Sequence, residues 1–459
     1  MAAGTLRTPP TAALVAVGTA GVLCLAVAAG VRSGPADGFL VLAGLAALTG
    51  GVALAAWLSP ALTISAGLIL SLASGRFGDL GSPIGLDRVV IVAGVLAVVV
   101  RELRSPTARL RVRGIDLWLA GILLIAAVSA YFAGTWRQNG PFFALVDNLG
   151  VVPFLLFWVA PAAFGTPRER RLLLCVLTGV GAYLGITALA ETLNWNWAIF
   201  PRYILDPTVG LHYGRARGPF AEAAANGLSM FFCAVAAAVL LATDKRRHVL
   251  LATVIGLCGV GIVFALTRQV WLAAGLGTLI AMLAQRRLRV WVLPTFAAAG
   301  VAVFVIFATV PGFNSRAEDR VRDQRPVWDR LNSNAATWRM LAERPLTGYG
   351  WGGYRENINT FFRLAPDRAW TGAVSRPHNV FLANGAELGA LVLVAWIAAL
   401  AIAIGGALRR RGPPDLGVWR AGLIAVAIGW LVVANFTPMY YAFCHSVLWL
   451  WAGICWSRT

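Results

Sequence analysis

The chain has 459 residues, of which 59% are apolar and only 13% are charged. Soluble domains carry about 25% charged residues, so this composition excludes a soluble globular protein, a disordered chain and a coiled coil. Apolar runs of about 20 residues recur from end to end, which indicates a polytopic membrane protein. The net charge of +19 comes almost wholly from arginines between these runs. We therefore expect anionic lipid headgroups and phosphates as partners, and not nucleic acid.

Fourteen apolar runs predict an all-α bundle of about twelve to fourteen transmembrane spans. The first run follows a lone Arg7 like a signal peptide, but with so many later spans we interpret it as an uncleaved helix. The third run is the most polar of the set. The predicted spans are 11–30, 38–57, 60–75, 86–101, 115–134, 145–164, 171–192, 219–243, 248–266, 270–285, 290–311, 378–405, 417–436 and 443–457.

Arginine clusters predict the orientation of the bundle. Cytoplasmic connectors are enriched in Lys and Arg, and in the fourteen-span arrangement all five clusters fall on one side. That side is predicted to be cytoplasmic and to hold both termini, which implies a multi-pass protein of the cytoplasmic (inner) membrane. The clusters are Arg101 to Arg113, Arg168 to Arg171, Lys245 to Arg247, Arg286 to Arg289 and Arg409 to Arg411.

Two long connectors, 193–218 and 312–377, are then predicted on the outer side. The domain organisation is spans 1–11 over 1–311, one long extracytoplasmic loop over 312–377, and spans 12–14 over 378–459. Within the loop, apolar residues recur at helical spacing between Pro326 and Arg344, which predicts an amphipathic helix on the membrane surface or across the bundle. These residues are Trp328, Leu331, Ala335, Trp338 and Leu341.

Three reactive side chains share the predicted outer mouth: Arg217, Arg268 and His378. Guanidinium groups bind phosphate oxygens bidentately, and a histidine of near-neutral pKa can move a proton. This set favours a phosphate-bearing lipid substrate. Each residue has an alternative interpretation. Arg268 is otherwise an interfacial anchor, Arg217 one of several loop arginines, and His378 a capping partner of Asn379.

Glu387 is a carboxylate inside the apolar run 378–405, and such residues are functional or paired in membrane proteins. Nine residues after His378 it faces the opposite side of a regular helix, so a direct catalytic dyad is not expected. Asn384 shares its face and could satisfy it. We therefore predict a structural or supporting role for both residues.

Neither a phosphate loop nor a metal or disulfide framework is predicted. The run Gly348-Tyr-Gly-Trp-Gly352 has no preceding strand and no following Lys-Ser/Thr, so we interpret it as a tight turn. The six cysteines lie in or beside apolar runs without zinc-ligand spacing. They are Cys24, Cys175, Cys233, Cys258, Cys444 and Cys455.

Taken in order, these motifs resemble the superfamily of O-antigen ligases and Wzy-type polymerases. The resemblance extends over about 200–405 and comprises Arg-Gly-Pro-Phe, Thr-Arg, Pro-Leu-x-Gly-x-Gly, His-Asn and Glu-x-Gly. The chain departs from the family in having Glu222-Ala-Ala-Ala-Asn226 where Asn-Pro-Asn is frequent, and Thr267 where Ser is common. The first departure leaves the role of Asn226 open.

The resemblance implies an inverting glycosyltransferase that uses a polyprenyl-diphosphate-linked glycan and a hydroxyl acceptor on a glycan, a lipid or another molecule, without cofactor or metal. It implies that Arg217 and Arg268 bind the diphosphate and that His378 is the general base. Further substrate contacts fall to Arg215, Arg376, Asn379 and Tyr349. The loop aspartates form no Asp-x-Asp pair of the kind that nucleotide-sugar enzymes use to hold a divalent ion.

Two alternatives remain open at this point. A Wzy-type polymerase differs from a ligase only in its acceptor, and no residue separates the two. A lipid-linked oligosaccharide flippase is the alternative from a different class. Transporters usually have internal repeats and ionisable groups at the midplane. Here no repeat is visible and a 65-residue outer loop is unusual for a transporter, so the sequence favours a transferase.

Overall fold

The computed structural model describes residues 50–77, 85–105, 110–310, 313–363, 377–410 and 412–457. In these ranges all regular structure is helical, which confirms the predicted all-α fold. Seven of the described helices are long and apolar enough to cross a membrane, and four shorter apolar helices accompany them. The first predicted span and most of the second lie outside the described residues.

The amino-terminal half of the bundle forms from closely packed helices. Gly67 and Gly94 lie where the first two helices, 60–70 and 86–103, contact each other. A Cβ on Gly67 would lie 2.4 Å from the side chain of Ile91, and a Cβ on Gly94 would lie 2.7 Å from that of Ile64. The helices of this half are α3 (Pro60–Leu70), α4 (Leu86–Leu103), α5 (Gly114–Phe132), α6 (Asn139–Phe143), α7 (Val151–Ala163) and α8 (Pro167–Thr192).

The carboxyl-terminal half supplies the centre of the bundle and one lipid-exposed flank. The helix Ala223–Thr243 is the most deeply buried of the candidate spans, whereas the span Arg286–Thr309 is exposed along most of its apolar length. Its helices are α9 (Ala223–Thr243), α10 (His248–Phe264), α11 (Arg268–Ala284), α12 (Val292–Thr309), α17 (Ala390–Arg409), α18 (Leu416–Ala434) and α19 (Ala442–Cys455).

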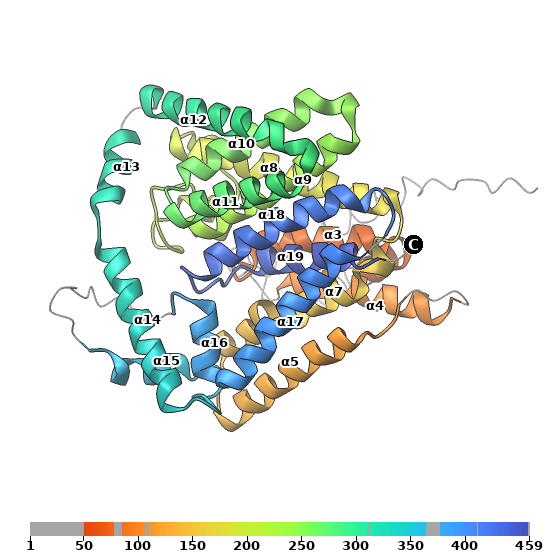
Figure 1. Cartoon of the computed structure of the whole chain (residues 1–459), viewed down its shortest axis with the longest axis vertical. Coiled ribbons are helices and arrows are strands. Elements are labelled where there is room, and N and C mark those ends of the chain that lie inside the picture. The colour runs from red at the N-terminus through yellow and green to blue at the C-terminus, as the bar shows by residue number, and fades with distance from the viewer. Residues whose placement is uncertain are drawn as a thin grey trace, which may run out of the picture.

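Three of the five arginine clusters meet at one end of the bundle. Arg170 forms an ion pair with Asp415 at 2.8 Å. Arg113 and Arg410 both stack on the ring of Trp456, with guanidinium-to-centroid distances of 4.9 and 3.8 Å. The chain ends on this side of the bundle (Figure 1). These three clusters therefore share a side as the charge pattern requires, and the assignment of that side to the cytoplasm stays a prediction.

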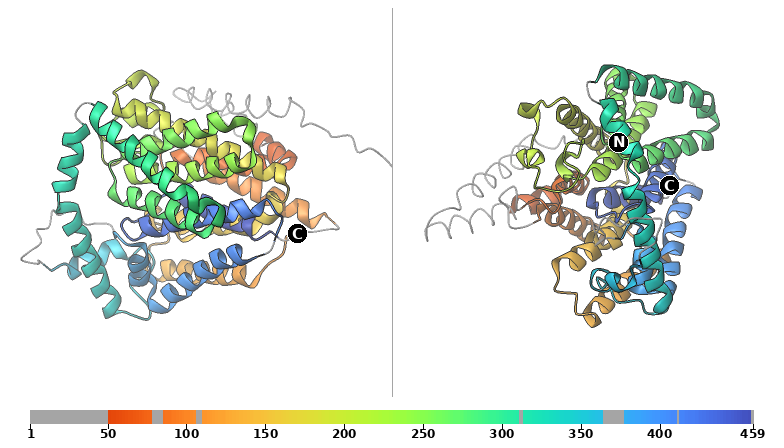
Figure 2. Two further views of the ribbon diagram at one scale, coloured as in Figure 1. Left: turned by 45° about the horizontal axis from the view of Figure 1, so that its top comes forward. Right: turned by 90° about the vertical axis from the view of Figure 1, so that its left-hand side faces the viewer.

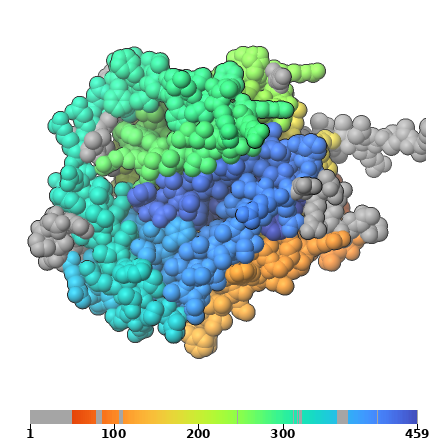
Figure 3. All heavy atoms as spheres, in the orientation of Figure 1, coloured from red at the N-terminus to blue at the C-terminus, as the bar shows by residue number. Residues whose placement is uncertain are grey.

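The opposite end of the bundle is crossed by the helices of the long loop. α13 (Phe313–Arg322), α14 (Arg325–Glu343) and α15 (Tyr354–Asn357) run across it in both ribbon views (Figures 1 and 2). In the space-filling view they lie along one side of the molecule, next to the segment 380–409 (Figure 3). The helix expected over 326–344 is thus confirmed as α14.

The buried face of α14 differs from the predicted apolar stripe. Trp338 is 60% exposed and Leu331 is 43% exposed, whereas Ser333 and Thr337 are buried. The hydroxyl of Thr337 lies 2.9 Å from that of Tyr354, and Met340 of the same helix packs against Tyr354 and Ile358, so the buried face is both polar and apolar. Of the predicted stripe, Leu341 is buried, while Trp338 and Leu331 remain exposed.

The predicted single span over 378–405 was wrong in its continuity. The helix breaks at Gly389 into α16 (Val380–Leu388) and α17 (Ala390–Arg409). Gly389 has φ +85°, and a Cβ there would lie 2.2 Å from the carbonyl oxygen of Leu346. Because the Pro345–Leu346 backbone approaches so closely, only glycine fits this position. The break lets α16 turn away from α17 and pack against α14 (Figure 1).

Candidate active site

His378 lies in the short segment that enters α16, outside the membrane-spanning helix α17. Asn379 caps α16, since its Oδ1 accepts the backbone N–H of Leu382 at 3.0 Å. The Asn379 amide also donates to Oδ1 of Asn435 at 3.1 Å, which ties this segment to the end of α18. Asn379 is therefore occupied in capping, and the half-buried imidazole of His378 is not needed for that role.

Charged residues of α14 act on His378. Burial and, less strongly, the positive charge of Arg330 lower the pKa of His378 to about 4, while Asp329 opposes the shift. The imidazole is therefore neutral at physiological pH and can accept a proton. Arg330 was not among the predicted site residues. In the sequence, Arg330 is distinguished only by its position on the polar side of the amphipathic helix.

Tyr441 and Glu222 border the same region. Burial raises the pKa of the Tyr441 hydroxyl, Glu222 raises it further, and Arg330 opposes the shift. The Tyr441 hydroxyl lies 3.0 Å from that of Thr437. The charge of Arg330 on α14 therefore acts both on His378 before α16 and on Tyr441 before α19.

Arg268 is the first residue of α11 and its side chain is exposed at the loop-covered end of the bundle. Its guanidinium donates to the backbone carbonyl of Asp323, between α13 and α14, at 3.2 Å. Among the described residues this is the one hydrogen bond of its guanidinium, and the residue is exposed. Arg268 therefore has the exposure that a phosphate-binding residue needs.

Arg217 has a different environment from the one that the sequence predicted. Its side chain is fully buried, and its guanidinium donates to the backbone carbonyls of Ile204, Asp206 and Val209. The distance to the Ile204 oxygen is 2.7 Å. Burial lowers the pKa of Arg217, and Glu191 opposes this shift. The residue holds the 201–217 loop together, and a diphosphate could reach it only if that loop opened.

The remainder of the Arg-Gly-Pro-Phe motif packs tightly on α9. Gly218 has φ +52°, and a Cβ there would lie 2.4 Å from Oδ1 of Asn226. The Asn226 amide donates to the carbonyl of Ala216 at 3.1 Å, which gives this residue a structural role in the loop. Arg215 is half-buried in the same loop. The sequence placed Arg215 and Arg217 together at the mouth, but only Arg215 retains surface exposure.

Glu387 holds the glycine-rich turn of the long loop. Its carboxylate accepts the backbone N–H of Tyr354, with 3.2 Å between Oε1 and N, and that of Gly352. The turn is also hydrogen-bonded to the end of α16. The backbone N–H of Tyr349 donates to the carbonyl of Ala386, and that of Gly350 donates to the carbonyl of Glu387, both at 2.9 Å. These backbone groups, rather than Asn384, are the partners of Glu387.

The predicted tight turn is therefore present, with positive φ at Gly348, Gly350 and Gly352. Gly348 allows the closest approach, since a Cβ there would lie 2.4 Å from the carbonyl of Glu387. Asn384 is buried on α16 near this junction. The Pro-Leu-x-Gly-x-Gly and Glu-x-Gly motifs, which lie about 40 residues apart in the sequence, thus form one structural unit.

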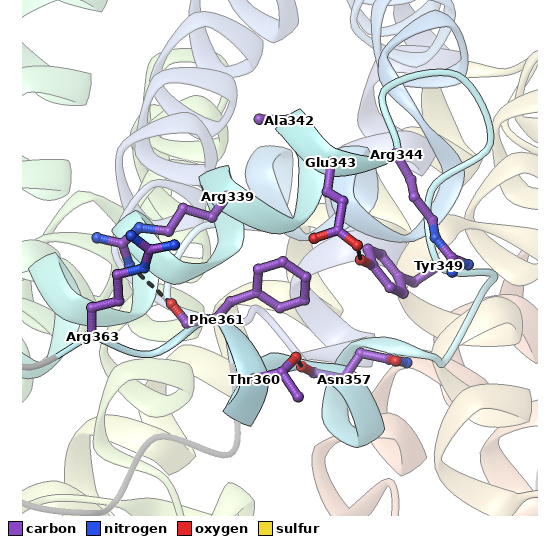
Figure 4. Close-up of a pocket in the computed structure, with 9 residues that line it drawn as sticks. All are labelled: Arg339, Ala342, Glu343, Arg344, Tyr349, Asn357, Thr360, Phe361 and Arg363. Carbon is purple, nitrogen blue, oxygen red and sulfur yellow. Dashed lines mark hydrogen bonds between the residues drawn. The ribbon is translucent and has the colours of Figure 1, made fainter.

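Tyr349 faces a pocket beside the turn rather than His378. The pocket has a volume of about 540 Å³ and lies between the end of α14 and the segment 354–363 (Figure 4). The Tyr349 hydroxyl donates to Oε1 of Glu343 at 2.8 Å. Arg376, the remaining residue to which the sequence assigned substrate binding, lies outside the described residues.

Comparison with known proteins found a match in the second half of the chain, where several of the motifs lie. Residues 251–397, about a third of the chain, match the family model described as O-Antigen ligase. No curated protein matches the chain. The matched segment contains Arg268, His378 and Glu387, while Arg217 precedes it. This match confirms that residues 251–397 resemble the O-antigen ligases.

Proposed function

We propose that the protein transfers a glycan from a polyprenyl diphosphate to an acceptor hydroxyl at the outer face of the cytoplasmic membrane. The observation that carries this proposal is the position of His378. It is a neutral, half-buried histidine beside Arg330, at the same covered end of the bundle as the exposed Arg268. A base next to guanidinium groups suits a reaction that creates a diphosphate leaving group.

The reaction is one displacement at the anomeric carbon. The acceptor oxygen forms a bond to this carbon as the bond to the diphosphate oxygen breaks, so the configuration inverts. The acceptor proton passes to the free imidazole nitrogen of His378. The negative charge that develops on the diphosphate is stabilised by Arg268, whose planar fork matches phosphate oxygens.

Arg330 and Arg217 take roles that the sequence alone did not assign. Together with burial, which is the larger cause, the positive charge of Arg330 keeps the imidazole of His378 unprotonated, and the same charge attracts the anionic donor. Arg217 shapes the outer loop through its three carbonyl contacts and contributes to activity through that structure. Glu387 and the glycine-rich turn hold α16 and thereby His378 in position.

Ligase and polymerase activities differ only in the acceptor. If the acceptor is a terminal lipid or another molecule, the protein is a ligase, and if it is another lipid-linked repeat unit, the protein is a polymerase. Anionic phospholipids surround the arginine-rich end in either case. Transfer to a panel of different acceptors therefore distinguishes a ligase from a polymerase.

The test is reconstitution of the full chain in liposomes with a polyprenyl-diphosphate glycan and a panel of acceptors. Positioned proton transfer contributes about 10²–10⁴-fold to rate, so His378→Ala should lose about that factor while it retains donor binding. His212→Ala, at an exposed histidine paired with Glu222, is the matched control and should stay within a few-fold of the parent.

Two results would overturn this assignment. Full turnover in His378→Ala would remove the proposed base, and loss of donor binding would make His378 a substrate-binding residue. Movement of the lipid-linked glycan across the bilayer without transfer to any acceptor would instead identify a flippase. His445→Ala is a poorer control, because this buried side chain contacts the Met439 carbonyl at 2.8 Å and its loss perturbs α19.

A further inference from the structure

The pocket that Tyr349 faces is polar and lies on the loop-covered end, apart from His378. Arg339 on its rim follows Arg330 by nine residues, which corresponds to about 14 Å along α14. Its volume of about 540 Å³ lies within the usual range of about 300–1,000 Å³ for small-molecule sites. The lining residues are Arg339, Ala342, Glu343, Arg344, Tyr349, Asn357, Thr360, Phe361 and Arg363.

The pocket carries an excess of positive charge. Three arginines and one glutamate line it, and the side chains of Arg339 and Arg363 extend toward each other at one end (Figure 4). Arg339 is fixed there because its guanidinium donates to the carbonyl of Phe361 at 2.9 Å. Two guanidinium groups that converge repel each other, and an anion bound between them would relieve this repulsion.

The opposite wall of the pocket is aromatic. The rings of Tyr349 and Phe361 meet edge to face with centroids 5.6 Å apart, and the guanidinium of Arg344 lies 4.5 Å from the Tyr349 centroid. The hydrogen bond from Tyr349 to Glu343 fixes the tyrosine ring. Rigid aromatic faces next to amide and hydroxyl groups suit a sugar, which presents both apolar C–H faces and hydroxyls.

From this combination we propose that the pocket binds an anionic sugar, whose carboxylate or phosphate group lies between Arg339 and Arg363 and whose ring packs on Tyr349 and Phe361. The proposal rests on the proposed function in one respect, namely that the protein handles glycans. Because the pocket lies along α14 from the reaction centre, it binds a sugar beyond the reacting one. This sugar belongs either to the donor or to the acceptor glycan.

The first experiment measures binding directly and needs no turnover. The probe is trigalacturonate, with its uncharged methyl ester as the matched ligand, added to the purified full chain in detergent. Loss of one charge-assisted contact weakens binding by about tenfold or more, so Arg363→Gln and Arg339→Gln should each do so. Arg355→Gln changes an exposed arginine of α15 outside the pocket and should leave the affinity unchanged.

Equal affinity for trigalacturonate and its methyl ester would overturn the proposal. So would unchanged binding in both pocket variants, or an equal loss in Arg355→Gln. His378→Ala should bind trigalacturonate like the parent. Retained binding together with a parent that transfers no glycan would therefore reject the proposed transferase function and leave the pocket assignment in place.

The second experiment identifies the source of the sugar by transfer kinetics. One arm combines an acidic donor glycan with a neutral acceptor, and the other combines a neutral donor with an acidic acceptor. The pocket variants should raise the KM for the acidic substrate in one arm by about tenfold and leave transfer between two neutral substrates unchanged. An equal decrease of kcat with neutral substrates would overturn the proposal, because it would indicate damage to the reaction centre.

Discussion

The carboxylate of Glu387 on α16 accepts a hydrogen bond from the backbone N–H of Tyr354, with 3.2 Å between Oε1 and N. Together with the bond from Gly352, this contact fastens the glycine-rich turn to the helix that begins two residues after His378. Supporting residues of this kind orient the groups that react, and small displacements of a base are costly to the rate.

Replacement of Glu387 should therefore lower stability first and activity in consequence. Glu387→Ala leaves two backbone N–H groups without their acceptor, at about 1–3 kcal/mol for each buried group. Glu387→Gln keeps an acceptor oxygen and should lose much less. Thermal unfolding in detergent, followed by tryptophan fluorescence, compares the two variants. Equal melting temperatures for Glu387→Ala and the parent would contradict the structural role.

Gly389→Ala should destabilise the fold at the α16–α17 break. The residue has φ +85° and ψ +164°, a conformation in which a side chain costs on the order of 1–3 kcal/mol before its clash with Leu346 is counted. Gly405→Ala in α17 is the matched control, since a Cβ there meets no atom within 4 Å. The melting temperature should fall for Gly389→Ala and be unchanged or higher for Gly405→Ala.

The pH dependence of transfer should reflect the low pKa of His378. Burial, with the charge of Arg330, lowers this pKa to about 4, and the proton-accepting form is the neutral imidazole that prevails above it. The rate kcat/KM should accordingly stay level from pH 8 down to about pH 5, rather than fall near the ordinary histidine pKa of about 6.5.

Arg330→Gln tests the electrostatic part of this argument. Removal of the positive charge raises the pKa of His378, so the acid limb of the pH–rate profile should move to higher pH. A parent profile that already falls near pH 6.5 would contradict the neutral buried histidine. His212→Gln provides the control and should leave the acid limb in place.

Substitutions of Arg268 should lower activity, whereas substitution of Arg217 should lower stability. Arg268→Lys keeps the charge but loses the planar fork, so it should reduce kcat nearly as much as Arg268→Ala, by about 10²-fold or more. Neither change should alter the melting temperature, since Arg268 is exposed. Arg217→Lys should instead lower the melting temperature, because lysine cannot satisfy three carbonyls in the same geometry. A fully active Arg268→Lys variant would return Arg268 to the role of an interfacial anchor.

Cysteine labelling tests the topology. Asn359→Cys lies at the loop-covered end and Arg287→Cys in the fourth arginine cluster, and both positions are exposed. In a background without the native cysteines, an impermeant reagent should label the first from outside the cell and the second only after permeabilisation. Labelling of both positions from one side would reject the predicted orientation.

The sequence by itself determined the class of fold and the end at which the candidate site lies. Apolar runs must be helical in lipid because every backbone group has to be satisfied internally, so helices at the predicted positions from residue 60 onward follow directly from composition. Charge clusters are long-range features of the chain, and those containing Arg113, Arg170 and Arg410 meet at one end. Periodicity also located α14.

Only the tertiary structure decided how individual residues are used. Arg217 and Arg268 look alike in the sequence, but the fold surrounds one with carbonyl oxygens and leaves the other exposed. The break at Gly389 depends on the approach of Leu346, more than 40 residues away, so no local propensity shows it. The low pKa of His378 likewise depends on its burial and, after that, on the charge of Arg330 on a different helix. Such contacts depend on three-dimensional proximity, which helical periodicity and motif order do not encode.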